Sequence, residues 1–428
     1  MALKLAIVGG GSTYTPELID GFARLRDTLP IGELVLIDPA ADRLELIGRL
    51  ARRIFAKQGH GGLVTTTTDL TAGVAGADAV LLQLRVGGQA ARDRDETWPL
   101  ECGCVGQETT GAGGLAKALR TVPVVLDIAE QVRRANPEAW IVDFTNPVGI
   151  VTRALQTAGH KAVGLCNVAI GFQRKFAAHL GVDPELIRLD HVGLNHLTWE
   201  RGVTLLDAPG ADTGREVLPE LLDGFGPEIA EDLLLPLPVI RRLGVVPSYY
   251  LRYFYQHDAV VAELKVKGSR AAAVAAIERE LLEMYADPTL DTKPELLAKR
   301  GGAFYSEAAV QLIASLLGTG AASSVQVVNT RNDGVLPFLP EDAVIEVPAS
   351  VGRDGVRPLP QRPVEPLYAG LIANVTAYEQ LALEAALKGS RDRVFDALLA
   401  HPLVGQLDLA EQLTDRLLAE NKAHLPWA

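Results

Sequence analysis

The sequence predicts an α/β protein that begins with a doubly wound parallel sheet and continues into a mixed α/β domain. In the first third of the chain, short apolar runs bounded by Gly, Pro, Asp or Asn alternate with amphipathic stretches. This alternation is typical of βαβ units and of a parallel sheet covered by helices. After about residue 167 the pattern changes to longer helices with few strand candidates. We therefore expect a sheet domain at residues 1–167 and a second domain at residues 168–428.

The elements of the first domain follow from local patterns. Short runs rich in Leu or β-branched residues predict strands at Leu3–Val8, Leu34–Ile37, Ala79–Leu84, Trp140–Phe144 and Ala162–Leu165. Apolar residues at three- and four-residue intervals predict helices at Pro16–Leu25, Asp42–Lys57 and Thr121–Ala135. Because crossovers between parallel strands are right-handed, a ligand is expected beyond the carboxyl ends of the strands.

The helices and strands of the second domain are predicted from the same two sequence patterns. Helical spacing is found at Ala271–Tyr285, Ser306–Leu317 and Leu367–Lys388, and short strand candidates are Val325–Val328 and Val344–Val347. Two Pro-rich segments, Leu233–Pro238 and Arg357–Pro366, are expected to be exposed connections.

Composition excludes several classes of partner. The chain has 428 residues, 48% of them hydrophobic, which is enough for a large core. Lys and Arg number 41 against 53 Asp and Glu, a net charge of −12 that repels nucleic acid and anionic lipid. We therefore expect no nucleic-acid and no membrane partner, whereas a small anionic substrate stays compatible with local cations. Three cysteines give no disulfide framework, and the start of the chain lacks a signal-peptide pattern, so we expect a cytoplasmic protein.

A glycine-rich turn follows the first predicted strand and precedes the first helix, and comprises Gly9, Gly10, Gly11, Ser12, Thr13 and Tyr14. Gly9 and Gly11 match the first two glycines of a dinucleotide-binding turn, but Tyr14 stands at the third glycine position. Asp38 ends the second strand, where a carboxylate can accept hydrogen bonds from a ribose diol. The alternative is a tight turn and an Asp that caps a helix. The combination favours nucleotide binding.

Cys166 and His196 are candidate metal ligands. Cys166 follows a predicted strand and so lies beside the same ligand site. A solitary cysteine is usually a packing residue, and the thirty positions between Cys166 and His196 give no local metal-ligand spacing. If the two side chains converge, a thiolate and an imidazole would bind a borderline transition metal and leave positions for substrate oxygens.

Two further segments carry polar groups of interest. Residues 247–255 hold four of the nine tyrosines, a pattern typical of a core or an interface. A tyrosine acts as a base only where a cation or metal lowers its pKa. Ser269 is a natural N-cap, and Arg270 then lies in a first helical turn, where a cation is unfavourable unless an anion docks there. A solvated cation beside Glu278 is the alternative for Arg270.

Nine segments, taken in chain order, form a set: Ile7–Glu17, Arg85–Gly88, Arg92–Glu96, Gly106–Gly111, Thr145–Pro147, Gly164–Asn167, Gly193–His196, Pro247–Tyr255 and Ser269–Ala271. Together they resemble the NAD- and divalent-metal-dependent glycosidases of glycoside hydrolase family 4. The resemblance spans most of the chain and implies a Rossmann-like fold similar to the lactate and malate dehydrogenases. Family 4 is an exception to two-carboxylate glycoside hydrolysis, so no Asp/Glu pair is expected.

The resemblance implies roles for individual residues. Cys166 and His196 match the ligands of a Mn²⁺ or similar ion, Tyr250 the catalytic base, and Glu108 the residue that raises the basicity of this tyrosine. Tyr250 is preferred to Tyr249 because the family places its base three residues after the proline and just before a leucine. The implied NAD contacts are Gly9, Gly10, Gly11, Ser12, Thr13 and Asp38.

The resemblance also implies the substrate. Arg92 and Asn146 match sugar contacts, and Arg270 matches the residue that binds a sugar phosphate. The Cys166-Asn167 pair resembles the pattern of the β-specific members. The α-specific members have a Cys-Asp pattern instead, in which the Asp protonates the leaving group. Ala169, where the β-type pattern has a proline, is a departure. The implied substrate is a phosphorylated disaccharide or other 6-phospho-β-glucoside.

The implied reaction combines a hydride cofactor with hydrolysis. NAD⁺ oxidises C3 of the sugar, the base removes the C2 proton, the aglycone is eliminated, water adds at C1 and the hydride is returned. The resemblance also implies a homodimer or homotetramer. The alternatives are a 6-phospho-α-glucosidase or other family 4 glycosidase, a 2-hydroxy-acid dehydrogenase on the same fold, and an NAD-responsive binding protein without turnover.

Overall fold

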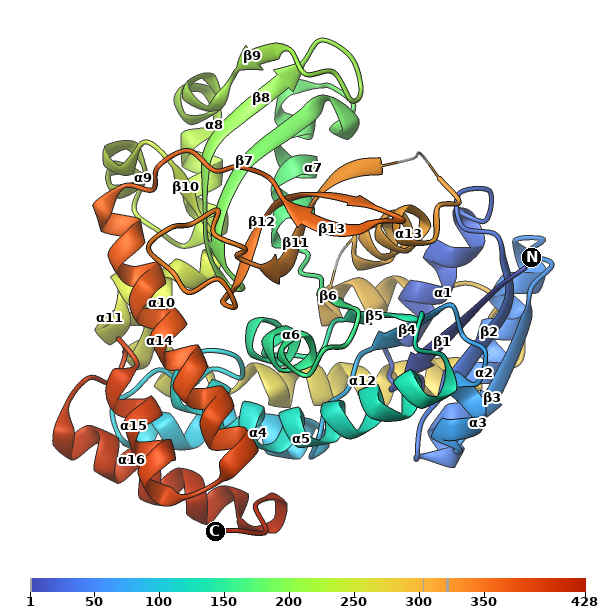
Figure 1. Cartoon of the computed structure of the whole chain (residues 1–428), viewed down its shortest axis with the longest axis horizontal. Coiled ribbons are helices and arrows are strands. Elements are labelled where there is room, and N and C mark those ends of the chain that lie inside the picture. Colours follow the sequence, from blue (N-terminus) through green and yellow to red (C-terminus); the bar gives the residue numbers. More distant parts are fainter. Residues whose placement is uncertain (1, 303, 321–322) are drawn as a thin grey trace.

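The computed structural model describes residues 2–302, 304–320 and 323–428 and is built around a nine-stranded sheet (Figure 1). Six of the strands run parallel in the order β6-β5-β4-β1-β2-β3, which is the doubly wound order. The predicted fold class is therefore confirmed. The six are β1 (Leu3–Val8), β2 (Ile31–Ile37), β3 (Leu63–Thr67), β4 (Ala79–Leu82), β5 (Trp140–Asp143) and β6 (Ala162–Gly164).

Three later strands extend the same sheet. β11 (Ser323–Arg331), β12 (Val344–Gly352) and β13 (Gly355–Pro358) pair antiparallel with one another, and β11 joins the edge of β6. The sheet thus takes strands from both predicted ranges, 1–167 and 168–428. The boundary between the two ranges stays a prediction.

The helices of the first domain match the predicted periods, with one large difference. α1 (Thr15–Arg24) and α2 (Ala41–Lys57) are close to prediction, but α5 (Gly111–Ala135) begins at Gly111 rather than Thr121. The first turn of α5 contains three glycines, which are poor helix formers and so do not predict a helix. A Cβ on Gly113 would lie 2.4 Å from the carbonyl oxygens of Asp95 and Gln107, so the absence of side chains lets this turn pack closely.

Four further helices complete this part of the chain: α3 (Leu70–Val74), α4 (Gly88–Glu101), α6 (Val148–Thr157) and α7 (Val168–Leu180). Helix α4 was not predicted because its sequence is mostly polar and has no continuous apolar stripe. Its buried residues lie at its carboxyl-terminal half and include Asp95, Glu96 and Trp98.

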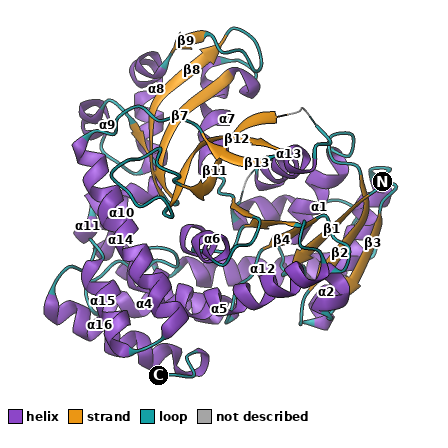
Figure 2. Ribbon diagram, viewed as in Figure 1, coloured by secondary structure: helices purple, strands orange, loops and turns teal. Residues whose placement is uncertain are grey.

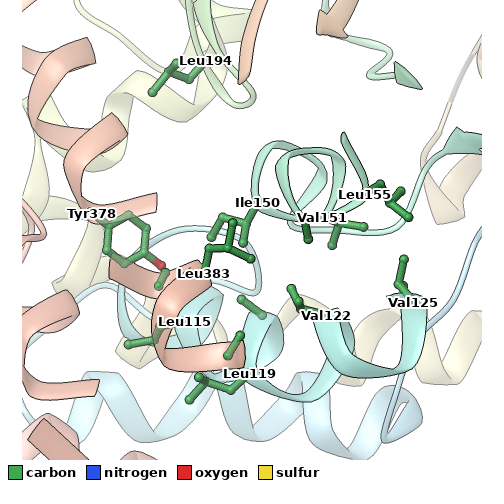
Figure 3. Close-up of a cluster of buried hydrophobic side chains, with 14 of the residues drawn as sticks. Leu115, Leu119, Val122, Val125, Ile150, Val151, Leu155, Leu194, Tyr378 and Leu383 are labelled. Carbon is green, nitrogen blue, oxygen red and sulfur yellow. The ribbon is translucent and has the colours of Figure 1, made fainter. Parts of the chain in front are cut away.

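Helices cover both faces of the parallel sheet (Figure 2). On one face α5, α6 and α14 (Pro366–Lys388) pack together, and Figure 3 shows Val122 of α5 facing Val151 of α6. On the other face lie α1, α2, α12 (Arg270–Ala286) and α13 (Tyr305–Leu317). The sheet is therefore buried on both sides, as continuous apolar strands require.

A second, antiparallel sheet stands beside the first. It contains β7 (Ile187–Leu194), β8 (Leu197–Leu206), β9 (Gly214–Glu216) and β10 (Val246–Pro247), and it packs against α7, α8 (Leu218–Leu233) and α9 (Leu237–Leu243). The β7–β8 hairpin was not predicted. The remaining helices are α10 (Arg252–Tyr255), α11 (His257–Lys267), α15 (Arg391–Ala400) and α16 (Leu407–Asn421). Within the described residues, no helix combines the length and hydropathy needed to cross a bilayer.

The interface between α14 and α6 contains a buried carboxyl group. An oxygen of Glu379 would lie 2.8 Å from a Cβ on Gly149, so a side chain at this position would have to displace the Glu379 carboxyl group. Burial raises the pKa of Glu379 to about 8, and the charge of Arg153 offsets only part of this effect. The folded protein therefore favours the neutral acid.

We expect the stability of the protein to depend on pH through Glu379. Because the folded-state pKa is raised, the contribution is full below the unfolded pKa of about 4.5 and is lost as pH rises to about 8. The slope is about 1.4 kcal/mol per pH unit. Glu379→Gln should remove this part of the decline, measured as the free energy of urea unfolding at several pH values. A difference between wild type and variant that is constant with pH would contradict the assignment.

Candidate active site

A cavity of about 990 Å³ lies beyond the carboxyl ends of the parallel strands, at the β1–β4 switch point where a doubly wound sheet binds ligands. Eleven of the residues predicted for the site line it: Gly9, Gly11, Ser12, Asp38, Arg92, Glu108, Asn146, Asn167, His196, Tyr250 and Arg270. The sequence separation between these residues exceeds 250 positions, so the fold brings them together.

Three predicted residues do not line the cavity. Gly10 packs beneath the turn, where a Cβ would lie 2.8 Å from the Leu36 side chain. Thr13 is buried, and its hydroxyl donates to Glu278 Oε1 at 2.9 Å. Cys166 is buried directly before the cavity residue Asn167. We therefore assign Gly10 and Thr13 to the support of the turn rather than to its surface.

The glycine-rich turn is held against the ends of two strands. Gly9 has φ +89°, and a Cβ there would lie 2.7 Å from the Gln83 carbonyl oxygen. The Asp38 carboxylate accepts hydrogen bonds from the amides of Gly11 at 3.1 Å and Ala40 at 2.9 Å. Each Asp38 oxygen has a second lone pair, so the carboxylate can still accept a ribose hydroxyl from the cavity.

Tyr14 explains why the third glycine of the dinucleotide pattern is missing. Its hydroxyl donates to the Gly302 carbonyl oxygen, and the Arg300 guanidinium lies 5.4 Å from its ring centroid. Arg300 in turn pairs with Glu278 at 3.1 Å. The side chain at this position thus connects the turn to the second half of the chain, which a glycine could not do.

His196 lies directly against Tyr250, and Cys166 lies within electrostatic range of the same tyrosine. The His196 ring stacks on the Tyr250 ring, with centroids 3.7 Å apart and planes 8° apart, and Cys166 is among the groups that raise the pKa of the Tyr250 phenol. Both residues are also within the electrostatic reach of Glu346. The fold therefore gathers the predicted ligands at one place, although they are far apart in sequence.

The donor set suits a borderline transition metal. Burial lowers the pKa of His196 to about 4, so its imidazole is neutral at pH 7, as a ligand must be. Burial also raises the pKa of the Cys166 thiol, so metal binding would displace a proton. Among the described residues no three His, Cys, Asp or Glu side chains form a metal-binding group. Further ligands would come from substrate oxygens or water, and Asn146 Oδ1 is buried nearby without a partner.

Glu108 is the centre of a buried charge cluster beside Tyr250. It pairs with Arg85 and Lys117, and Arg92 Nε lies 3.1 Å from its Oε1. Although burial acts in the opposite direction, the charges of Lys117, Arg85 and Arg92 hold the pKa of Glu108 well below its usual range. Burial, with additions from Cys166, Tyr253 and Glu108, raises the pKa of Tyr250. A tyrosine base here therefore needs positive charge.

Arg270 lies in the first turn of α12, at the rim of the cavity. Ser269 caps this helix, because its hydroxyl oxygen accepts the Ala272 amide at 3.0 Å. The amides of the first turn of α12 are only partly available to an anion, because the Ala271 amide donates to Glu96 Oε2 at 2.7 Å. Arg270 itself donates to the Lys299 carbonyl oxygen at 2.7 Å. An anion at this site would thus meet the guanidinium more than the helix terminus.

The cavity residues that received no role from the sequence include five polar side chains near the predicted site: Arg85, Gln107, Thr109, Lys117 and Arg300. Three of them lie in the family-like segments, but nothing in those segments indicates which side chains face the cavity. Lys117 had a local signal, because it and Arg120 are the two cations in the apolar first half of α5, and both are almost fully buried. A buried lysine requires a carboxylate partner, which here is Glu108.

Comparison with known proteins gives matches over nearly the whole chain. The model of the family 4 glycosyl hydrolases matches residues 4–182, and the model of the family 4 glycosyl hydrolase C-terminal domain matches residues 191–404. The chain is 38% identical to a probable 6-phospho-beta-glucosidase of Bacillus subtilis, over 99% of this chain and 97% of that protein.

Solved structures show the same relationship. The 6-phospho-beta-glucosidase of Thermotoga maritima, solved with manganese, NAD⁺ and glucose-6-phosphate, superposes with a TM-score of 0.90 at 32% identity over 99% of both chains. The malate dehydrogenase of Salinibacter ruber superposes with a TM-score of 0.53 at 15% identity over 91% of this chain and 99% of that chain, which is a similarity of fold alone. The chain therefore belongs to family 4 of the glycosyl hydrolases.

Proposed function

We propose that this protein hydrolyses 6-phospho-β-glucosides with bound NAD⁺ and a divalent metal such as Mn²⁺. The observation that carries the proposal is that one cavity is lined by residues of the glycine-rich turn, by His196 stacked on Tyr250 and by several cations, with Cys166 buried directly before the lining residue Asn167. The 6-phospho-beta-glucosidase of Escherichia coli, to which the chain is 35% identical over 99% of its length, supports the same substrate class.

The residues that would hold the two cofactors differ in kind. The cavity-lining residues of the turn, Gly9, Gly11 and Ser12, would take the NAD⁺ phosphates on their backbone, Gly10 and Thr13 would support the turn, and Asp38 would take a ribose hydroxyl. Cys166 and His196 would bind the metal. When bound, NAD⁺ would accept the hydride of sugar C3 and later return it, while the metal would acidify the C2 proton by polarising the sugar oxygens.

The residues of this chain would then orient the sugar and move its proton. Tyr250 Oη would remove the proton at C2, and Glu108, as a nearby fixed negative charge, would keep this phenolate basic. Arg92 and the unpartnered Asn146 Oδ1 would bind sugar hydroxyls. Because the hydride is returned in each turnover, no net oxidation would occur.

Asn167 supports a β-linked rather than an α-linked substrate. An amide cannot protonate a leaving group, so this position lacks the acid that the Asp of the Cys-Asp pattern provides in the α-specific members. The aglycone of a β-glucoside would leave C1 by elimination, with water rather than residue 167 supplying the proton to its oxygen. We also propose, on the family resemblance, that the protein is a cytoplasmic homodimer or homotetramer, for which analytical ultracentrifugation is the test of subunit number.

The function is tested with a chromogenic 6-phospho-β-glucoside, assayed with and without NAD⁺ and Mn²⁺ in heavy water. We expect aglycone release only when both cofactors are present, no release from the unphosphorylated glucoside, and deuterium at C2 of the product. Activity after complete removal of NAD⁺ would overturn the proposal. Net NADH accumulation with lactate or malate would favour a simple dehydrogenase, and NAD⁺ binding without turnover would favour a binding protein.

Arg270→Ala should raise KM for the phosphorylated substrate. A hydrogen bond to a charged group contributes about 1.5–3 kcal/mol, which corresponds to roughly 10- to 150-fold in KM. Arg279→Ala, on the same helix α12 but outside the cavity lining, is the matched control and should leave KM unchanged. An unchanged KM for Arg270→Ala would place the phosphate elsewhere in the cavity.

A further inference from the structure

We propose that Gln107 and Thr109 are positioning residues that hold the proton of His196 on Nδ1 and so keep the lone pair of Nε2 available for the metal. The proposal rests on the proposed metal site. It concerns a relay of two hydrogen bonds, from His196 Nδ1 to Thr109 Oγ1 and from Thr109 Oγ1 to Gln107 Oε1, at 2.8 and 2.7 Å.

The orientation of Gln107 is fixed by the backbone. Its side-chain oxygen accepts the amide of Thr109 at 2.5 Å and the amide of Thr110 at 2.8 Å. With the side-chain amide reversed, an NH₂ group would face two N–H donors. The atom that contacts the Thr109 hydroxyl is therefore an oxygen, which can only accept.

The direction of the relay follows from this constraint. The Thr109 hydroxyl has one proton, and it donates this proton to Gln107 Oε1. Its oxygen is then an acceptor toward His196, so the remaining bond requires a proton on His196 Nδ1. The opposite tautomer would leave two acceptors in contact at 2.7 or 2.8 Å, which is repulsive. Only the Nδ1–H tautomer satisfies every group.

Both ends of the relay are held rigidly. A Cβ on Gly114 would lie 2.5 Å from the Thr109 carbonyl carbon, so helix α5 packs directly on this segment. His196 has φ +63° in the two-residue turn between β7 and β8, a conformation that is costly for a residue other than glycine. Its ring is fixed on the other side by stacking on Tyr250. No hydrogen bond among the described residues reaches its Nε2 atom.

The first test is the affinity for Mn²⁺, measured by electron paramagnetic resonance of the free ion with the full-length protein. Loss of an outer partner of a metal-bound histidine typically costs 10- to 100-fold in affinity, and we expect this loss for Thr109→Val. Thr109→Ser keeps the hydroxyl that serves as the outer partner, so this variant should bind Mn²⁺ within about threefold of wild type. Thr121→Val is the matched control, because Thr121 is buried on α5 with no partner for its hydroxyl.

Each result decides between relay and packing. Wild-type affinity in Thr109→Val would overturn the proposal. An equal loss in Thr109→Val and Thr109→Ser would also overturn it, because the methyl group and not the hydroxyl would then be the cause. If wild-type protein and Cys166→Ala bind Mn²⁺ equally, the proposed metal site fails, and this outcome is distinct from both.

The second test needs no metal. In metal-free protein labelled with ¹⁵N-histidine, the nitrogen shifts of His196 report directly which ring nitrogen carries the proton, and His196→Gln identifies its signals. We expect Nδ1–H in wild type and Thr109→Ser, and a change toward Nε2–H or a mixture in Thr109→Val. An Nε2–H tautomer in wild type would overturn the proposal, whether or not the metal site is correct.

Discussion

Tyr250→Phe should lower kcat for a 6-phospho-β-glucoside by about 10²- to 10⁴-fold, the range that a positioned general base contributes. The Phe ring can still stack on His196, as the Tyr250 ring does at 3.7 Å, so only the phenolic oxygen is lost. The affinity for Mn²⁺ and the KM should therefore change little. The measurement is steady-state kinetics combined with the rate of C2 deuterium incorporation.

Tyr249 provides the control for this prediction. It is the neighbouring tyrosine, it also lines the cavity, and its hydroxyl accepts a hydrogen bond from Arg252 at 3.0 Å. Unlike Tyr250, it is about one-third exposed and does not stack on His196. Tyr249→Phe should keep kcat within about threefold, since a base is the larger contributor. A large loss in Tyr249→Phe with near-normal Tyr250→Phe would reverse the assignment made from the sequence.

The fold could be predicted where a local pattern decides the structure. β1 lies at its predicted bounds because five apolar residues, interrupted only by Lys4, run directly into a glycine turn and define a buried strand. Helix α4 could not be predicted, because its buried charges face partners from distant segments. Asp95, for example, pairs with Arg120 on α5, and both are nearly fully buried. A charged residue is read as exposed until its partner is known.

The site shows the same limit. Local spacing argued against a shared site for Cys166 and His196, and the family resemblance alone suggested it. The structure gives the physical reason: His196 is in a turn of a hairpin in the second sheet, and Cys166 follows a strand of the first. Two sheets must pack before the residues meet. The partners of Glu108, which come from three segments, could not be predicted for the same reason.

Cys166→Ala should abolish the activation by Mn²⁺ and lower the Mn²⁺ affinity by more than about 100-fold, the upper end for loss of an outer partner. The reason is the small number of donors. The described residues offer no group of three His, Cys, Asp or Glu side chains, so loss of the thiolate leaves His196 without a second ligand from the protein. Calorimetric titration with Mn²⁺ gives the affinity, and Mn²⁺-dependent kinetics give the activation.

Cys104→Ala separates a metal role from a packing role. Cys104 is also buried, with a pKa raised to about 11 by burial and by Cys102, and its thiol donates to the Leu403 carbonyl oxygen at 3.6 Å. Both substitutions remove one buried sulfur, so their costs in folding stability should be similar, about 1–3 kcal/mol. Only Cys166→Ala should change Mn²⁺ binding. If both variants lose activity in proportion to stability and bind Mn²⁺ normally, Cys166 is a packing residue, as a solitary buried cysteine usually is.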